Sequence, residues 1–199
     1  MSDTPTRDAK LVEYLNDAYA NEKQLETTLG AHAEVTTHGE YAKRLKDHLK
    51  ETRSHATQLS RRIKQLGGVP ATVSMPGPDG LGRLAENVSG RFGKAKAVAG
   101  DKLQSVRRVG EQERMLQNAR AEYAEEAQEI ANYAVIDSLA TAVGDKETAK
   151  LARDIRRDEE RMQKFLADLL PELSAAVAHD EIPVSEIEGP GAKHATAVK

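Results

Sequence analysis

The sequence predicts an all-α protein in which four long helices form a bundle. Two observations lead to this fold class. Helix-forming residues such as Ala, Leu, Glu, Lys and Arg abound, whereas the chain of 199 residues holds only five Tyr, two Phe and no Trp. Apolar residues also recur at steps of three and four along four segments, as the buried face of a helix requires. With 39% apolar and 31% charged residues, the chain can build one domain with a sizeable core.

The composition excludes several classes of site. Because the chain has no cysteine, it cannot form disulfides, thiolate zinc sites, iron–sulfur clusters or a cysteine nucleophile. A metal ion would therefore be held by oxygen atoms and imidazoles. The net charge of −3 and pI near 6.1 do not favour binding to nucleic acid or to an anionic membrane. The polar start of the chain and the lack of a long apolar stretch predict a cytoplasmic protein without a membrane span.

The first two helices are expected on either side of a break near residues 36–39. The apolar stripe of the first helix ends at this break, and that of the second ends at Leu66-Gly67-Gly68-Val69-Pro70, where glycine caps the helix and proline prevents its continuation. The two stripes consist of Leu11, Leu15, Ala18, Leu25 and Leu29, and of Tyr41, Leu45, Leu59 and Ile63. The short break makes these helices an antiparallel hairpin.

A second hairpin is expected in the other half of the chain. Its first helix ends at Gly144 and its second at Pro171. The stripes are Met115, Ala119, Tyr123, Ile130, Tyr133, Ile136 and Ala140 in one helix, and Leu151, Ile155, Met162, Leu166 and Leu169 in the other. At 1.5 Å per residue, helices of this length reach roughly 40 Å.

A connector at about 67–110 separates the hairpins and is long enough to cross the full length of the bundle. Two hairpins joined by one long crossover have the connectivity of ferritin-like bundles. The crossover is expected to hold helical pieces at about 81–88 and 95–109, and its charge is locally positive. We interpret this charge as a solvated face. Contact with nucleic acid or with an acidic partner is the less favoured alternative, and Phe92 alone could stack on a base.

The chain is expected to divide into a bundle and a tail. Residues 1–170 form the four-helix domain, including the crossover. Residues 171–199 are expected to form a short helix remnant followed by a flexible C-terminal tail, because the sequence becomes polar and contains proline and glycine after residue 174.

Acidic residues interrupt the apolar stripe of every predicted helix. Glu22 stands at the centre of the first stripe and Glu159 at the centre of the last. The remaining candidates are His48, Glu51 and His55 in the second helix, and Glu122, Glu126 and Glu129 in the third. A lone buried carboxylate costs several kcal/mol unless it is paired, protonated or bound to a metal ion. Because all four helices carry such residues, we expect a shared cause.

The hairpin geometry predicts that these residues lie at one depth. Positions that face each other in the first hairpin sum to about 75, so Glu22 should lie opposite the stretch between Glu51 and His55. Positions in the second hairpin sum to about 289, so Glu129 should lie beside Glu159. If the hairpins pack in register, the two clusters meet and supply the oxygen and nitrogen ligands of a di-iron or di-manganese site.

Other interpretations apply to single residues. Glu122 and Asp158 are expected at the edge of their stripes, pointing outward or paired with Arg or Lys. His48 is either a core histidine or a ligand, whereas His55 is the better ligand because it faces Glu22. Tyr133, like Tyr123, is expected to serve packing.

Four strings resemble a known family, the YciE/YciF type of ferritin-like stress protein, over about residues 8–170. The strings are LNDAYANEKQL at 15–25, HLKET at 48–52, Glu126-x-x-Glu129-x-x-x-Tyr133, and Asp158-Glu159-Glu160. The resemblance implies a ferritin-like bundle, a homodimer, a dinuclear metal centre and a role in the stress response. It also implies metal ligands at Glu22, Glu51, Glu126 or Glu129, and Glu159.

The sequence departs from the usual ferritin-like pattern, in which the second and fourth helices each carry Glu-x-x-His. The second helix instead places His55 four residues after Glu51, and the fourth has Met162 three residues after Glu159. Both spacings still face one side of a helix. The departure leaves open a single-metal site, an asymmetric pair of ions or a relic that no longer binds metal tightly.

The first functional hypothesis is a stress-associated protein that handles iron and O2 or peroxide at a carboxylate-bridged di-iron centre, with manganese as the other candidate metal. Carboxylates such as Glu51 and Glu159 would bridge the ions, while Glu22, Glu129 and His55 would bind terminally; Glu126 completes the expected ligand set. The second hypothesis is a metal-free helical bundle whose inward acids pair with basic side chains and whose surface binds a partner.

Overall fold

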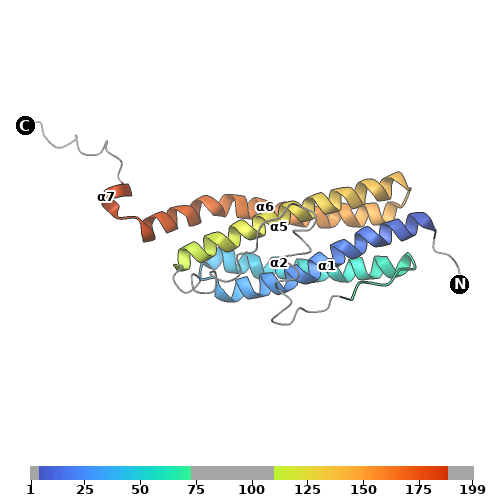
Figure 1. The fold of residues 1–199 in the computed structure, drawn as a ribbon, viewed down its shortest axis with the longest axis horizontal. Helices are drawn as coiled ribbons and strands as arrows, with labels where there is room; N and C mark the ends of the chain where they lie inside the picture. The colour runs from blue at the N-terminus through green and yellow to red at the C-terminus, as the bar shows by residue number, and fades with distance from the viewer. Residues whose placement is uncertain (1–4, 73–109, 188–199) are drawn as a thin grey trace, which may run out of the picture. The chain divides into compact units, whose positions relative to one another are not determined.

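A computed structural model describes residues 5–72 and 110–187, and these residues form helices without any strand (Figure 1). The helices are α1 (Thr6–Val35), α2 (Gly39–Gln65), α5 (Glu111–Ala142), α6 (Lys146–Glu181) and the short α7 (Val184–Ile187). The predicted all-α fold class is therefore confirmed. Within the described ranges, no helix is long and apolar enough to span a membrane.

The ends of the helices follow from local chemistry. Gly67 and Gly144 have φ angles of 79° and 76°, in the left-handed region that glycine adopts without strain. Each glycine closes a helix end at which backbone amides bond to free carbonyls of the last turn. The side chain of Asp145 accepts a hydrogen bond from the backbone N–H of Thr148 at 3.0 Å and so caps the start of α6.

The four long helices pack as two antiparallel hairpins. Helix α1 packs against α2 and α5, and α6 packs against α5 and α2. The start of α5 lies beside the turn between α1 and α2, because the Thr37 hydroxyl bonds to Glu111 and lies 3.6 Å from the sulfur of Met115. The end of α2 lies beside the opposite turn, where Arg62 binds Asp145. The end of α2 and the start of α5 therefore lie at opposite ends of the bundle.

The predicted helical pieces and positive charge of the crossover lie outside the described residues, except for its first few positions. The predicted C-terminal tail also lies outside them from residue 188 onward.

Two apolar layers occupy the core and a polar layer separates them. The layer nearer the turn between α1 and α2 contains Leu25, Leu29, Ala33, Tyr41, Leu45, Met115, Ala119, Met162, Leu166, Leu169 and Leu173. The layer nearer the opposite end contains Leu15, Ala18, Leu59, Ile63, Tyr133, Ile136, Ala152 and Ile155. Burial of the apolar side chains stabilises the bundle. The apolar layers therefore hold the polar side chains in place, although burying those polar side chains is unfavourable by itself.

Two expectations about the helices are wrong in detail. Tyr123 is 36% exposed, and its neighbour Glu122 takes the buried position on α5. Helix α6 continues through Pro171 to Glu181. A proline inside a helix removes one backbone hydrogen bond, but Leu169 and Leu173 on either side of it are buried and keep this part of α6 packed against the core.

We expect Arg62→Ala to lower the free energy of unfolding by about 2 kcal/mol, because it removes a largely buried pair that joins the hairpins. The Arg62 guanidinium bonds to both Asp145 oxygens at 2.6 and 2.8 Å and to the Thr148 hydroxyl at 2.8 Å. Urea unfolding measures the change. The matched control is Arg61→Ala, at an exposed neighbour without an ion pair in the described ranges; an equal loss in both variants would contradict the role of the pair.

Candidate metal centre

The polar layer brings together side chains from all four long helices. Its members are Glu22 from α1, His48 and His55 from α2, Glu126 and Glu129 from α5, and Glu159 from α6. Each of these residues is at most 3% exposed. The predicted common depth is thus observed, since the hairpins pack in register and their two clusters meet.

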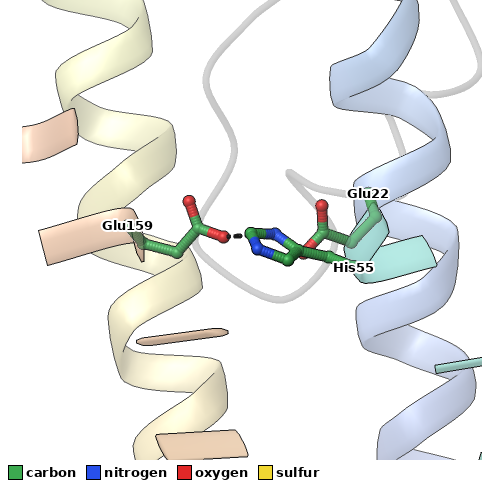
Figure 2. A group of neighbouring side chains, drawn as sticks. All are labelled: Glu22, His55 and Glu159. Carbon is green, nitrogen blue, oxygen red and sulfur yellow. Dashed lines mark ion pairs between the residues drawn. The ribbon is translucent and has the colours of Figure 1, made fainter. Parts of the chain in front are cut away.

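Glu22, His55 and Glu159 form the first group of possible ligands (Figure 2). Figure 2 shows the His55 imidazole between the two carboxylates, which come from different hairpins. Its Nδ1 atom lies 3.0 Å from Glu159 Oε1 and 3.4 Å from Glu22 Oε1, without a hydrogen bond to either. One atom from each residue could therefore reach a single metal ion.

His48, Glu126 and Glu159 form the second group. The Nε2 atom of His48 lies 3.0 Å from Glu126 Oε1 and 3.4 Å from Glu159 Oε2. Glu159 therefore belongs to both groups, with one oxygen near each imidazole. A carboxylate in this position can bridge two metal ions, each of which would also have one nitrogen ligand.

The second nitrogen of each imidazole contacts a carboxylate nearer the surface. His48 Nδ1 lies 3.0 Å from Glu51, and His55 Nε2 lies 3.0 Å from Asp158. These two carboxylates are 27% and 28% exposed. If each outer nitrogen donates its hydrogen, the inner nitrogen presents a lone pair to the polar layer, as in carboxylate–histidine–metal arrangements.

The donor atoms of the polar layer fit a pair of hard metal ions. One oxygen from each of Glu22, Glu126, Glu129 and Glu159 is buried and accepts no hydrogen bond from the residues that the structure describes. Buried polar atoms normally have a partner, and several unpaired carboxylate oxygens at one depth call for an explanation. Cations held by the two groups would give the oxygens of Glu22, Glu126 and Glu159 a partner, and oxygen ligands with one imidazole per ion are a set that iron accepts.

Burial and mutual repulsion favour protonated carboxylates in this layer. Burial raises the pKa of Glu126 to about 8, although the hydrogen bond with His48 opposes the shift. Burial, followed by the charges of Glu22 and Glu159, raises the pKa of Glu129 well above its usual range. Burial also raises the pKa of Glu22.

The imidazoles respond in the opposite sense. Burial disfavours the charged form of His48, but Glu126 and Glu51 outweigh it and raise the pKa to about 10. The carboxylates of Glu159 and Glu22 likewise outweigh burial and raise the pKa of His55 to about 11. Without metal, the polar layer therefore holds several protons at neutral pH.

Glu129 and Tyr133 complete the layer on α5. Glu129 belongs to neither three-residue group, but the charge of its ionised form interacts with Glu22, Glu126 and Glu159. The Tyr133 hydroxyl is buried and donates a hydrogen bond to Glu22. Tyr133 thus packs in the core, as expected, and also holds one of the candidate ligands, which the apolar periodicity did not predict.

Not every predicted ligand lies in a three-residue group. Glu22, His55, Glu126 and Glu159 do, whereas Glu51 and Glu129 lie beside the groups. Glu51 pairs with His48 and, at 3.1 Å, with Arg44. Burial alone would raise the pKa of Glu51, but these two partners outweigh it and lower the pKa to about 2. His48 belongs to the second group. Its position in the apolar stripe of α2 was the sequence signal for a possible ligand.

The sequence interpretation missed a second buried polar cluster, and its expectation for Glu122 was wrong. This residue is fully buried and accepts hydrogen bonds from the Tyr41 hydroxyl at 2.7 Å and from His32 Nδ1 at 2.6 Å. His32 and Tyr41 lie on α1 and α2, so the cluster ties α5 to the first hairpin. Asp158 is half-buried and pairs with Arg161, as expected, besides contacting His55.

Comparisons with known proteins agree with this architecture. Residues 6–179 match the family described as "Domain of unknown function (DUF892)". A comparison with curated proteins gives no match.

Several solved structures share the fold. A protein from Xanthomonas campestris pv. campestris is 24% identical, with 88% of this chain and 99% of that chain covered and a TM-score of 0.66. The stress protein YciF from E. coli is 20% identical, with coverage of 86% and 98% and a TM-score of 0.62. The Desulfovibrio desulfuricans bacterioferritin is 21% identical, with coverage of 100% and 98% and a TM-score of 0.63.

These similarities confirm the fold and the resemblance drawn from the four strings. The match covers the four long helices and the residues of the polar layer, including both three-residue groups. The chain therefore belongs to the DUF892 family and has a ferritin-like four-helix bundle of the YciE/YciF type.

Proposed function

We propose that this protein binds two iron ions in its polar layer and uses them to reduce O2 or peroxide during stress. The observation that carries the proposal is the pair of three-residue groups that share Glu159. Each group offers an imidazole nitrogen and carboxylate oxygens, and four buried oxygens of the layer accept no hydrogen bond within 5–72 and 110–187.

The structural neighbours support iron over other metals. The Desulfovibrio desulfuricans bacterioferritin is described with a diiron site in different catalytic states, and a neighbour from Bacillus anthracis as a ferritin-like, diiron-carboxylate protein. The neighbour YciF is described as a stress protein, which supports the proposed context. Manganese, the homodimer and the cytoplasmic location stay predictions.

The residues of this chain would divide the work as follows. Glu159 would bridge the two positions, while Glu22 with His55 and Glu126 with His48 would bind at one position each. Bound iron would supply the one-electron steps by which two Fe(II) together reduce O2 to peroxide, or peroxide to water.

Two carboxylates would act from outside the polar layer. Glu51 and Asp158 would fix the orientation of the imidazoles through the hydrogen bonds to their outer nitrogens. This assignment differs from the sequence hypothesis for Glu51, which placed it as a bridge. The surrounding apolar layers would keep bulk water from the centre.

The shared carboxylate predicts a distinctive pattern of metal stoichiometry. We expect two Fe(II) per chain in the natural sequence, about one in Glu22→Ala, about one in Glu126→Ala and none that binds tightly in Glu159→Ala, because Glu159 serves both positions. Anaerobic titration of the metal-free protein with Fe(II) measures these numbers.

A neighbouring residue of the same type serves as the control for this titration. Glu160 is exposed, adjacent in sequence to Glu159 and paired only with Arg156 at 3.3 Å in the described ranges. Glu160→Ala should therefore still bind two ions. Unchanged binding in Glu159→Ala would contradict the proposal.

Metal affinity should increase with pH between about 6 and 8. At pH 6 Glu126 and both imidazoles hold protons, because the pKa of Glu126 is about 8 and those of His48 and His55 are about 10 and 11. A metal ion must displace these protons, so lower pH weakens binding and binding acidifies the solution. A pH-indicator dye in weakly buffered protein measures proton release during a Zn(II) titration; release of no protons would contradict this expectation.

Thermal melting distinguishes a metal protein from the alternative, a metal-free bundle that binds a partner. The imidazoles pair with the buried carboxylates even without metal, and this observation favours the alternative. If the centre binds metal only when folded, Fe(II) at 100 times its Kd adds about 2.7 kcal/mol to the stability for each ion bound and raises Tm. The metal-free alternative predicts that Fe(II) leaves the Tm of the natural sequence equal to its Tm with chelator, and that Fe(II) likewise leaves the Tm of Glu159→Ala unchanged.

A further inference from the structure

A basic groove lies on the outer surface between α1 and α2, apart from the candidate metal ligands. Its volume is about 520 Å³, within the usual size of a ligand site. Tyr19, Lys23 and Glu26 of α1 line one side, and residues between 53 and 64 of α2 line the other. We refer to it as the α1–α2 groove.

The charge of the groove is strongly positive although the whole chain is acidic. Among the described residues that line it are four cations, Lys23, Arg53, Arg61 and Lys64, and one acid, Glu26. Its charge is therefore 4 − 1 = +3, against −3 for the complete chain. A cluster of this kind attracts anions over a distance set by the ionic strength.

The cations are not all neutralised by neighbours. Glu26 accepts a hydrogen bond from Lys23 and another from Arg53 Nε at 2.9 Å. Arg61 and Lys64 are exposed and form no ion pair within the described residues. Among the described residues, Arg61 and Lys64 therefore have no acidic partner, while Lys23 and Arg53 share Glu26.

The shape and the other polar groups favour a ligand with several negative groups in a row. From Arg53 to Lys64, α2 advances about 16 Å at 1.5 Å per residue, so the cations follow the groove instead of meeting at one point. The Ser60 hydroxyl, which makes no hydrogen bond within the described ranges, lies among them. Arg, Lys and Ser side chains are common ligands of phosphate oxygens.

We propose that the α1–α2 groove binds a short chain of phosphate groups, such as that of inorganic triphosphate or a nucleoside triphosphate. Nucleic acid fits less well because the groove offers one aromatic side chain, Tyr19, for stacking, and the molecule as a whole is acidic. The proposal does not depend on the metal centre, since no residue of either three-residue group lines the groove.

The test is calorimetric titration of metal-free, full-length protein with sodium tripolyphosphate at low salt. We expect saturable binding at one site per chain, weaker binding of orthophosphate, and at least about tenfold weaker binding of tripolyphosphate in the double variant Arg61→Gln and Lys64→Gln. Glu26→Gln should bind more tightly, because it removes the only acid of the groove and releases Lys23 and Arg53. Circular dichroism confirms that each variant is folded.

The matched control is the double variant Lys43→Gln and Lys46→Gln, which makes the same change in net charge on exposed positions of α2 outside the groove. It should bind tripolyphosphate like the natural sequence. An equal loss in both double variants, or no saturable binding, would overturn the proposal.

Two further ligands identify the source of the phosphates. ATP should bind about as tightly as tripolyphosphate if the phosphate chain alone is recognised. A 12-nucleotide single strand that binds far more tightly than either, with the same loss in Arg61→Gln and Lys64→Gln, would overturn the proposal in favour of a nucleic-acid groove.

Discussion

The burial of several carboxylates at the centre of a bundle is the constraint on which the rest of this structure depends. Glu22, Glu126, Glu129 and Glu159 would repel one another if all were charged. Two imidazoles placed among them and a share of protons offset that repulsion. Each helix must therefore hold its rotation and its axial position, because a shift of one residue would separate a carboxylate from its partner.

The surrounding elements maintain that alignment. Apolar layers on both sides of the polar layer fix the helices along their axes. Hydrogen-bonded polar groups toward each end of the bundle also hold particular helices together. Arg62 joins α2 to the turn before α6, and the Glu122 cluster joins α5 to the first hairpin. The polar layer costs stability by itself, and the metal binding proposed above would offset that cost.

The sequence predicted the four helices, their pairing and the depth of the acids, because periodicity and hairpin arithmetic act over long segments. The prediction was wrong where two neighbouring residues compete for one buried position, as with Glu122 and Tyr123. Adjacent residues differ by about 100° around a helix, and packing against the other helices decides which of them is buried. The prediction that the last helix ends at Pro171 was wrong because Leu173 packs in the core and stabilises the helix beyond the proline. The distinct places of His48 and Glu51 depend on side-chain rotamers, which spacing does not determine.

Each of the two three-residue groups draws members from both hairpins, and this arrangement bears on the long crossover between them. Side chains distant in sequence hold the halves together, so the crossover has only to reach from one end of the bundle to the other. The entropy lost on closing a loop rises slowly with its length. A change in the length of that connection should therefore alter the stability of the bundle much less than a change at the residues that join the two hairpins.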